Sequence, residues 1–411
     1  MLTNYRTILT QPSQALFWGG FTFSALGDAM TRVALTWYVY EQTQSAEALG
    51  WLTVCYTGPI IVGGLAAGTL LDRFDRRRVM VWDNVIRGLA VASIPIAQAL
   101  GLLTLYQVYA VAAVYGLLMM ISLAGGPALI PSLVEPEHLS TANALETLSY
   151  TVGGILGPLA AGVLIAWVGA PNVVAVDALS YLVFALALAR VQLRPASDEP
   201  DRADAPAYHL GHAVRLLFSN KVLLSTTLMF MAFNIGGGGL LSVWLPILSD
   251  QTLHGGPELY GALLGALSLG EVVSAFLAGG RRWTLSLGAL ICIAQMLSGL
   301  ALALLLWRPT VVSVIVGLAL FGAFSAPLTI WAQTLRMRVI PERLRGRAFA
   351  LLRMLMQSGN PIGGGLAGVL LPALGLTAVI AVSAGLAGLP GLLGYRVKEL
   401  RLGGEEVRRF R

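Results

Sequence analysis

Charged side chains are scarce in this sequence. Asp, Glu, Lys and Arg together make up 12% of the 411 positions, whereas apolar residues make up 56%. Soluble domains carry about 25% charged residues, because their surfaces must face water. The composition therefore excludes an ordinary soluble enzyme or binding domain, and it predicts a protein whose outer surface faces lipid.

Residues that mark metal, redox or nucleotide sites are also few. Cys55 and Cys292 lie in separate apolar runs without a CxxC neighbour, and the four histidines are scattered near loops. The only lysines, Lys221 and Lys398, follow no glycine-rich phosphate-binding loop. We therefore expect no metal, no cofactor and no built-in ATPase. The net charge of +6 is divided into short clusters between apolar runs, so we expect no nucleic-acid partner.

Long apolar runs dominate what is present. A hydrocarbon core of ~30 Å needs roughly 20 helical residues per crossing. The runs are too uniformly apolar for barrel strands, and backbone groups in lipid need internal partners, so helices are expected. The predicted spans cover residues 15–39, 47–71, 79–101, 105–130, 142–168, 172–190, 222–247, 258–279, 284–306, 310–333, 348–371 and 375–396. The fold class is thus an all-α membrane protein with about twelve transmembrane helices.

Basic residues predict the orientation of these spans. Alternate connections carry the clusters at 73–78, 281–282 and 336–347, together with the central linker and the tail, whereas the opposite connections hold only Arg308. Cytoplasmic loops are enriched in Lys and Arg, so both termini are expected in the cytoplasm. The protein itself is expected in the cytoplasmic (inner) membrane. The first run, 15–40, has no cleavage pattern and is expected to stay as a span.

A polar stretch over 191–220 divides the spans into two groups of six. Residues 195–206 are polar and Pro-rich, as in a linker, and 208–218 have the apolar spacing of a short helix on the cytoplasmic surface. Pro-Glu-x-Leu recurs at 136 and 341, and Ala-Gly-Val-Leu at 161 and 367. This repeat predicts two six-helix bundles at 1–190 and 221–396, a linker at 191–220 and a tail at 397–411, with a substrate site at the repeat interface.

The connection at 68–78 carries the most distinctive motif, Gly-Thr-Leu-Leu-Asp-Arg-Phe-Asp-Arg-Arg-Arg. It resembles the Gly-x-Leu-x-Asp-Arg-x-Gly-Arg-Arg loop of the major facilitator superfamily, except that Asp75 replaces glycine. The resemblance implies a cytoplasmic gate in which Gly68 allows close packing and Asp72 pairs with an arginine; a plain basic anchor is the alternative. The expected gate residues are Gly68, Asp72, Arg73, Asp75, Arg76, Arg77 and Arg78, with Asp83 and Arg87 at the cytoplasmic end of the next span.

Three further segments narrow the resemblance. The run 126–145, Gly27-Asp28 and Asp177 to Tyr181 are similar to the branch that contains macrolide efflux proteins and the enterobactin exporter. The segment 151–162 is similar to a glycine-proline motif of exporters, although ordinary packing glycines are the alternative. Its expected hinge or packing residues are Gly154, Gly157, Pro158 and Gly162. The resemblance implies export of an amphipathic molecule such as a drug, a macrolide or a siderophore.

Charges inside spans are the candidate proton or substrate site, because each costs at least ~2.5 kcal/mol unless it is paired or hydrated. Asp28 and Arg32 lie one turn apart on a polar stripe with Ser24 and Thr31. We expect Asp28 to exchange a proton and Arg32 to tune its affinity; a purely structural Asp28–Arg32 pair is the alternative.

Two residues of the second half complete the candidate site. Glu271 has no charged residue within a helical turn, so it is expected either to carry a proton or to contact a cationic substrate. A neutral, hydrogen-bonding Glu271 is the alternative. Asn234 opens the Gly-rich run 234–239 and is expected to line a cavity.

Together these features predict a proton-coupled exporter that works by alternating access. Its expected partners are a small-molecule substrate, protons and lipid, and it is expected to act as a monomer. The alternatives are an uptake symporter, the membrane part of an ATP-driven pump with a separate ATPase, and a non-transporting receptor. An enzyme is not expected, because no nucleophile and base cluster on neighbouring spans.

Overall fold

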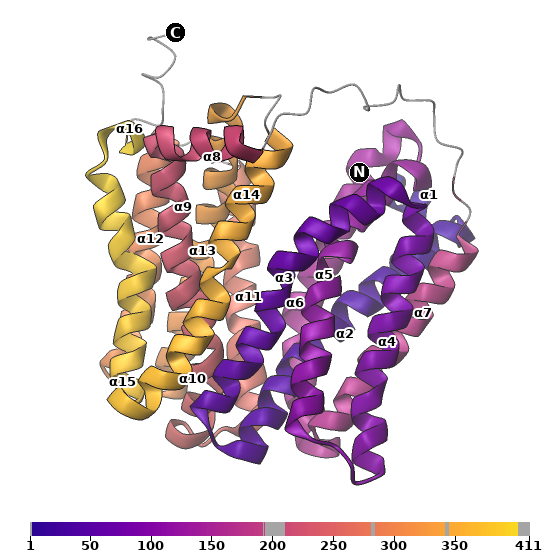
Figure 1. Ribbon diagram of the computed structural model, residues 1–411, viewed down its shortest axis with the longest axis horizontal. Helices are drawn as coiled ribbons and strands as arrows, with labels where there is room; N and C mark the ends of the chain where they lie inside the picture. The colour runs from indigo at the N-terminus through magenta and orange to yellow at the C-terminus, as the bar shows by residue number, and fades with distance from the viewer. Residues whose placement is uncertain (1, 192, 194–209, 281–283, 342–344, 402–411) are drawn as a thin grey trace. The chain divides into compact units, whose positions relative to one another are not determined.

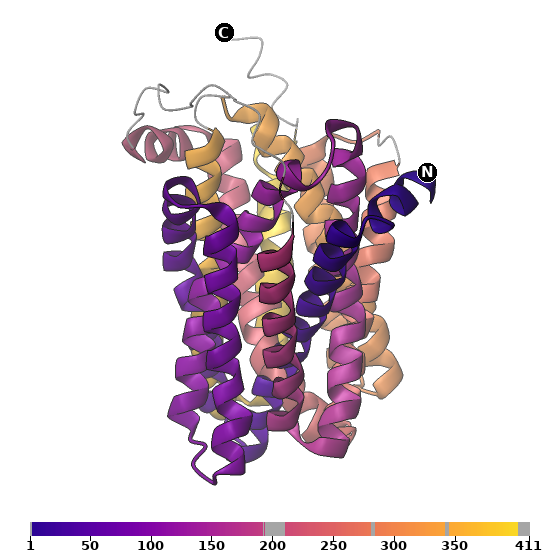
Figure 2. The same ribbon diagram turned by 90° about the vertical axis from the view of Figure 1, so that its right-hand side faces the viewer.

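The computed structural model describes residues 2–191, 193, 210–280, 284–341 and 345–401, and these residues are helical, with no strand among them. Four predicted features lie wholly or partly outside this range: the Pro-rich linker at 195–206, the basic pair at 281–282, the repeat residues 342–344 and the tail from residue 402 onward. Figures 1 and 2 show long helices that run side by side within each half of the chain.

The helices follow one another with short connections. The first half contains α1 (Leu2–Leu9), α2 (Pro12–Thr43), α3 (Ala46–Arg73), α4 (Arg76–Ala99), α5 (Leu105–Leu133), η1 (Pro136–His138), α6 (Leu139–Val168) and α7 (Ala170–Arg190). The second half contains α8 (Leu210–Ser219), α9 (Lys221–Phe233), η3 (Asn234–Leu240), α10 (Leu241–Ile247), η4 (Leu248–Thr252), α11 (Gly256–Gly280), α12 (Leu287–Ala303), η5 (Leu304–Leu306), α13 (Val311–Val339), α14 (Arg345–Gln357), α15 (Gly359–Tyr395) and α16 (Lys398–Arg401).

Most of these helices are long and apolar enough to cross a bilayer. Among the described residues nine pass this test, or ten when the bent helix α3 is counted as one span. The segment Ala348–Tyr395 counts once although α15 turns at Gly375, whose φ of 80° lies in the left-handed region that favours glycine. The predicted helical, multi-span membrane protein is therefore confirmed.

The contacts divide the chain into two compact units. The first unit comprises Met1–Gln42 and Gly58–Ala205, and the second comprises Thr43–Thr57 and Pro206–Arg411. The first half of α3 thus belongs to the second unit, unlike the predicted bundle 1–190. Glycine and hydroxyl contacts account for this, because a Cβ at Gly50 would lie 3.2 Å from the Cα of Gly368, and the hydroxyls of Thr53 and Ser242 are 3.0 Å apart.

Close packing of small residues joins α2 to α6 in the first unit. A Cβ at Gly153 would lie 2.6 Å from the carbonyl oxygen of Ala25, and a Cβ at Gly157 would lie 2.6 Å from the Cβ of Ala29. Small residues allow helix backbones to approach in lipid, where the hydrophobic effect between helices is absent. α6 continues as one helix through Pro158. Gly153 and Gly157 therefore set the distance between these two helices.

Glycines have a similar role in the second unit, where the chain forms the π-helix η3. A Cβ at Gly239 would lie 2.6 Å from the Cα of Gly363 on α15. The wide π-turn leaves the carbonyl of Gly236 available, and the hydroxyl of Ser383 on α15 donates to it. The Nε1 of Trp244 in turn donates to Ser383 Oγ at 3.3 Å. η3 and α10 are thereby fixed against α15.

The α2–α6 contact can be tested with glycine substitutions. Gly153→Ala is expected to destabilise the protein by about 1–3 kcal/mol, because the new methyl group meets backbone rather than a movable side chain. Gly19→Ala is the matched control on α2, since nothing lies within 4 Å of its Cβ position and alanine favours a helix. Thermal unfolding in detergent measures both variants. Equal unfolding temperatures for the two would show that the α2–α6 contact does not limit stability.

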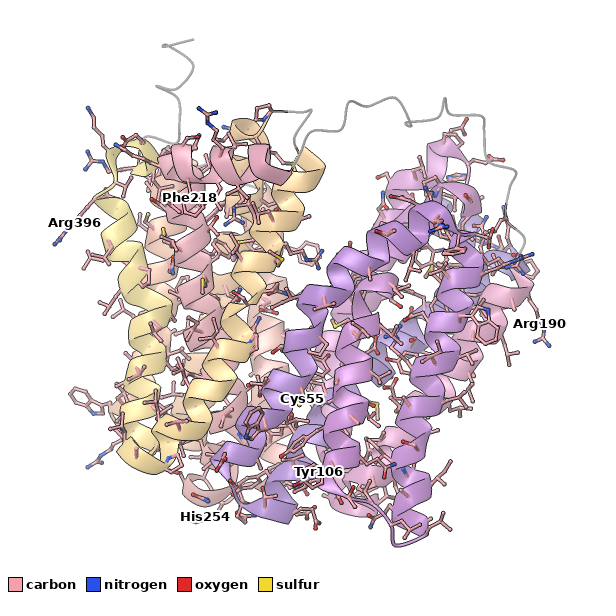
Figure 3. The ribbon with its side chains drawn as sticks, in the orientation of Figure 1. Cys55, Tyr106, Arg190, Phe218, His254 and Arg396 are labelled. Carbon is pink, nitrogen blue, oxygen red and sulfur yellow. The ribbon has the colours of Figure 1, made fainter. Side chains whose placement is uncertain are left out.

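An ion pair at one end of the second unit gives a pH-dependent contact. Lys221 Nζ donates to Glu399 Oε1 at 2.6 Å, and this bond holds the pKa of the Glu399 carboxyl below its usual value. Phe218 and Arg396 lie toward the same end of this unit, and His254 lies toward the other (Figure 3). Both side chains are exposed, so the contribution is small and weakened by salt.

The pair therefore predicts how α16 responds to acid. A lowered folded-state pKa means that the contact stabilises α16 above the unfolded pKa of about 4.3 and is lost as pH falls through the folded pKa. The rate of amide hydrogen exchange at residues 398–401, corrected for intrinsic rates, should rise as the pH falls from about 6 to about 3.5. Glu399→Gln should remove this pH dependence. An unchanged profile in that variant would contradict the assignment.

Candidate functional site

A buried arginine on α4 is the centre of a charge cluster in the first unit. Arg87 Nη2 lies 2.6 Å from Asp83 Oδ2, and both side chains are almost fully buried. Arg87 Nη1 donates to the Tyr181 hydroxyl at 2.9 Å, and the guanidinium lies 4.5 Å from the centre of the Tyr181 ring. Arg87 Nη2 also donates to Ser122 Oγ. The guanidinium therefore contacts polar groups from α4, α5 and α7.

Asp28 joins this cluster from α2. Its Oδ1 accepts hydrogen bonds from the Tyr115 hydroxyl at 2.6 Å and from the Tyr181 hydroxyl, and it lies 3.6 Å from Arg87 Nη1. The Asp28 side chain is 31% exposed, whereas the side chains of Arg87 and Asp83 are 2% and 0% exposed. Asp28 is thus the more exposed of the two carboxylates that pair with Arg87.

A third carboxylate lies next to Asp28. Asp177 on α7 is fully buried and accepts a hydrogen bond from Ser180 Oγ at 3.0 Å. A Cβ at Gly27 on α2 would lie 2.6 Å from Ser180 Oγ and 3.1 Å from the Cα of Asp177. Gly27 therefore lets α2 and α7 approach closely enough for Asp28 to reach Tyr181.

The structure differs from the sequence expectation in how these charges are paired. Asp28 was expected to act with Arg32, but Arg32 is exposed and the described contacts of the Asp28 carboxylate are with Tyr115, Tyr181 and Arg87. Asp83 and Arg87 were assigned to the cytoplasmic gate, yet they belong to the Asp28 cluster. The reason is helix rotation, which turns Arg87 into the bundle and toward α2.

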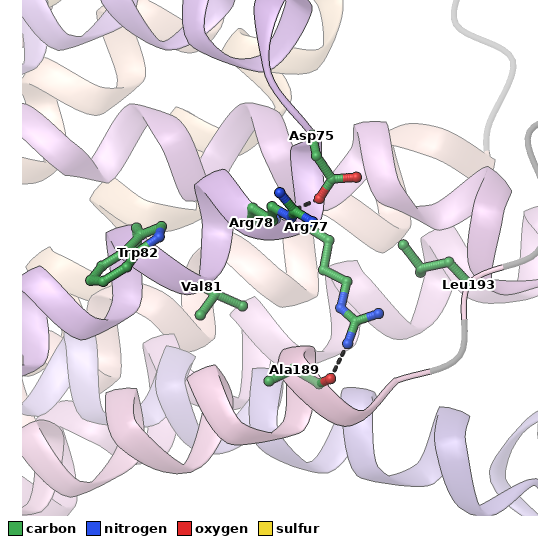
Figure 4. Close-up of a pocket in the computed structure, with 7 residues that line it drawn as sticks. All are labelled: Asp75, Arg77, Arg78, Val81, Trp82, Ala189 and Leu193. Atoms are coloured by element: carbon green, nitrogen blue, oxygen red, sulfur yellow. Dashed lines mark hydrogen bonds between the residues drawn. The ribbon is translucent and has the colours of Figure 1, made fainter.

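The connection before α4 is held within the first unit. Asp75, which replaces the glycine of the family pattern, caps α4 because its Oδ1 accepts from the backbone N–H of Arg78 at 2.8 Å. Arg76 donates to the carbonyl of Ala128 on α5 at 3.1 Å, and Arg77 donates to that of Ala189 on α7 (Figure 4). These bonds tie the start of α4 to two neighbouring helices.

A cavity of about 430 Å³ adjoins this connection. It is lined by Asp75, Arg77, Arg78, Val81, Trp82, Ala189 and Leu193 (Figure 4). Asp72 and Arg73 precede it and are exposed. Gly68 was expected to allow close packing, but nothing lies within 4 Å of its Cβ position. Gly63 has that role, since a Cβ there would lie 2.9 Å from the carbonyl carbon of Leu117.

The candidate residues of the second unit have different surroundings. Glu271 on α11 is partly buried, and its Oε1 accepts from Ser325 Oγ on α13 at 3.2 Å. Asn234 donates from Nδ2 to the carbonyl of Met356 at 2.9 Å, so this amide group joins η3 to α14. No group of three potential metal ligands occurs among the described residues.

Sequence reasoning missed several residues of the first unit. Tyr115, Ser122 and Tyr181 provide most of the hydrogen bonds in the cluster, but a hydroxyl in an apolar run does not reveal its partner. Glu146 on α6 was also missed, although a carboxylate inside the predicted span 142–168 is itself a signal.

The fold is that of solved multi-span transporters. The nucleoside transporter NupG (D323A mutant) is 12% identical in sequence, with 93% of this chain and 98% of that chain covered and a TM-score of 0.73. A D-xylose-proton symporter is 15% identical, with coverage of 96% and 99% and a TM-score of 0.69. Likeness at this identity shows the fold alone.

The amino-acid sequence also places this chain in a protein family. A family model described as a transmembrane secretion effector matches residues 7–406, so the chain belongs to this family of the major facilitator superfamily. It is similar to the multidrug efflux pump Tap of Mycolicibacterium fortuitum, with 26% identity over 86% of this chain and 87% of the relative. The enterobactin exporter EntS of Citrobacter koseri is 27% identical over 100% of this chain and 96% of the relative. The chain is therefore a transporter and not an enzyme.

The Arg87 cluster predicts a large loss of stability on removal of the guanidinium. Arg87→Ala leaves buried Asp83 without its cation, which typically costs about 3–5 kcal/mol. Arg32→Ala removes an exposed arginine on α2, and it is expected to change the free energy of unfolding by less than about 1 kcal/mol. Thermal unfolding in detergent compares the two variants. A loss for Arg87→Ala no larger than that for Arg32→Ala would mean that the cluster is not a major source of stability.

Proposed function

We propose that this transporter exports amphipathic small molecules across the cytoplasmic (inner) membrane, coupled to proton entry, by alternating access. The support for export is that both Tap, a multidrug efflux pump, and EntS, an enterobactin exporter, align with more than four-fifths of the chain. Drugs, macrolides and siderophores share an amphipathic character, and that character defines the proposed substrate class.

The proposed topology has twelve crossings in two halves of six, with both termini in the cytoplasm. Support comes from α2, which has 32 residues, and from the turn at Gly375, which divides the last long segment into two legs. Nine helices among the described residues pass the length and hydropathy test, and the proposed count of twelve adds α2, the bent α3 and the second leg of the last long segment. The excess of arginine at 73–78 and 336–347 over the single Arg308 supports cytoplasmic termini.

Asp28 is the proposed proton carrier, and one observation carries this proposal: Asp28 is the partly exposed member of a cluster in which carboxylates share Arg87. Asp28, Asp83 and Asp177 bring three potential negative charges to one guanidinium. Uncompensated charge inside a membrane protein is costly, so a proton on Asp28 reduces the cost. Protonation also weakens the attraction between Asp28 and Arg87, leaving Arg87 to Asp83.

A proton on Asp28 would therefore change the forces between helices. α2 contributes Asp28, α4 contributes Arg87, and α5 and α7 contribute the two tyrosines. Loss of the ionised carboxylate removes the charge that draws α2 toward α4, which biases the unit toward another arrangement. The loop 68–78 is the proposed cytoplasmic gate. Glu271 and Asn234 are proposed substrate or proton contacts of the second half.

Asp28→Asn tests the proton site. In everted vesicles from a pump-deficient host, wild-type protein should accumulate ethidium or erythromycin without ATP once the lumen is acidified. Asp28→Asn should reduce accumulation to the level of vesicles without the protein, because its amide cannot release a proton, while the unfolding temperature stays close to that of wild type. Glu258→Gln, the same chemical change at the start of α11, is the control.

Two outcomes would contradict parts of the proposal. Full pH-driven accumulation by Asp28→Asn would remove Asp28 as the proton site. Accumulation only in right-side-out vesicles, driven by external acid, would mean that the protein is an uptake symporter.

A further inference from the structure

Glu146 is a carboxylate of the first unit that is not part of the cluster around Asp28 and Arg87. It lies on α6, two turns from the start of the helix, and is partly buried. Among the described residues none forms a hydrogen bond or an ion pair with its carboxylate. Its Oε1 lies 3.0 Å from the Cβ position at Gly126 on α5, and Phe21 Cε2 on α2 lies 3.8 Å from the same point. The carboxylate thus lies where three helices meet.

The faces of α6 show which surroundings Glu146 has. With an advance of 100° per residue, the buried face of α6 contains Ala142, Leu145, Ser149, Gly153 and Gly157. At one edge of this face Glu146 begins a polar stripe, which continues around the helix with Tyr150, Asn143, Thr147 and Thr151. The members of this stripe are exposed or partly exposed, so Glu146 lies between the packed face and a polar, accessible face of α6.

Aromatic rings flank the carboxylate. The rings of Phe21 and Tyr150 are edge to face with centroids 5.2 Å apart, and Tyr150 lies one turn after Glu146 on the same stripe. Phe21 is buried at 4% exposure, whereas Tyr150 is 37% exposed. Because Gly126 has no side chain, the carboxylate can lie directly against α5. A carboxylate beside an exposed aromatic ring is the arrangement that binds organic cations, through charge and through the ring face.

We propose that Glu146 and Tyr150, with Phe21 fixing the tyrosine ring, form a subsite for the cationic group of a transported amphipathic molecule. This inference rests on the proposed export function and names its substrate class as organic cations. Phe21 precedes Asp28 by two turns of α2, so the subsite lies ~10 Å along that helix from the proton site. The negative charge, which has no partner among the residues that the structure describes, is then balanced by the substrate.

The test compares a cation with an uncharged compound. Equilibrium binding of radiolabelled tetraphenylphosphonium to purified full-length protein should weaken about tenfold or more in Glu146→Gln, the effect of losing one charge-assisted contact. Glu146→Asp should retain most of the affinity, and Tyr150→Ala should lose part of it. Glu137→Gln, an exposed glutamate near the start of the same helix, is the control and should bind as wild type. Vesicle accumulation of uncharged chloramphenicol should be unchanged in Glu146→Gln.

Several outcomes would overturn the subsite. They are wild-type affinity for tetraphenylphosphonium in Glu146→Gln, equal weakening in Glu137→Gln, and loss of chloramphenicol accumulation together with ethidium accumulation, which would make Glu146 a proton carrier. If Glu146→Gln does not fold, Glu146→Asp and Tyr150→Ala still decide, since full affinity in Tyr150→Ala removes the aromatic contact. If the protein pumps chloramphenicol but does not bind the cation, the subsite is rejected and the export function stands. If cation binding depends on Glu146 but nothing is pumped, the export function is rejected and the subsite stands.

Discussion

The buried guanidinium of Arg87 is the constraint around which the first unit is organised. Because the Arg87 side chain is almost fully buried inside lipid-length helices, its charge must be neutralised by groups of the protein. Asp83 pairs with it from the same helix and Asp28 from α2, and the hydroxyls of Ser122 and Tyr181 accept hydrogen bonds from it. These partners come from α2, α4, α5 and α7. Arg87 therefore keeps its ion pairs and hydrogen bonds only while these four helices hold their rotation and spacing.

Close helix packing makes this geometry possible. Gly27 brings α2 against α7, and Gly153 and Gly157 bring α6 against α2, so the polar groups meet at hydrogen-bond distance. The second unit has the same style of packing but different electrostatics. Its buried Arg336 donates to the carbonyl of Thr226 at 3.2 Å and lies over the Phe230 ring at 4.6 Å, and no carboxylate among the described residues pairs with it. Protonation of Asp28 can therefore alter the forces around Arg87. Among the described residues, Arg336 has no carboxylate beside it that could be protonated in the same way.

Much of the fold was predictable from the sequence, because the free energy of moving side chains from water to lipid depends on composition over a window of about 20 residues. Asp28 and Glu271 could be recognised for the same reason, as charges inside apolar runs. The partner of Asp28 could not, because Arg32 is near in sequence whereas Arg87 is near only after α2 and α4 have rotated and packed. Glu146 lies in a span that was predicted, but its proposed role depends on the polar stripe beside the packed face of α6, which a hydropathy window does not reveal.

Asp28 is proposed to carry the proton that is exchanged for substrate, and counting the protons released on substrate binding tests this proposal most directly. Ethidium would be added to purified protein in weakly buffered detergent solution, with a pH indicator reporting protons released per ethidium bound. Binding and protonation are linked reciprocally, so wild-type protein should release about one proton and Asp28→Asn none. Release of the same number of protons by Asp28→Asn, at equal ethidium binding, would contradict the account.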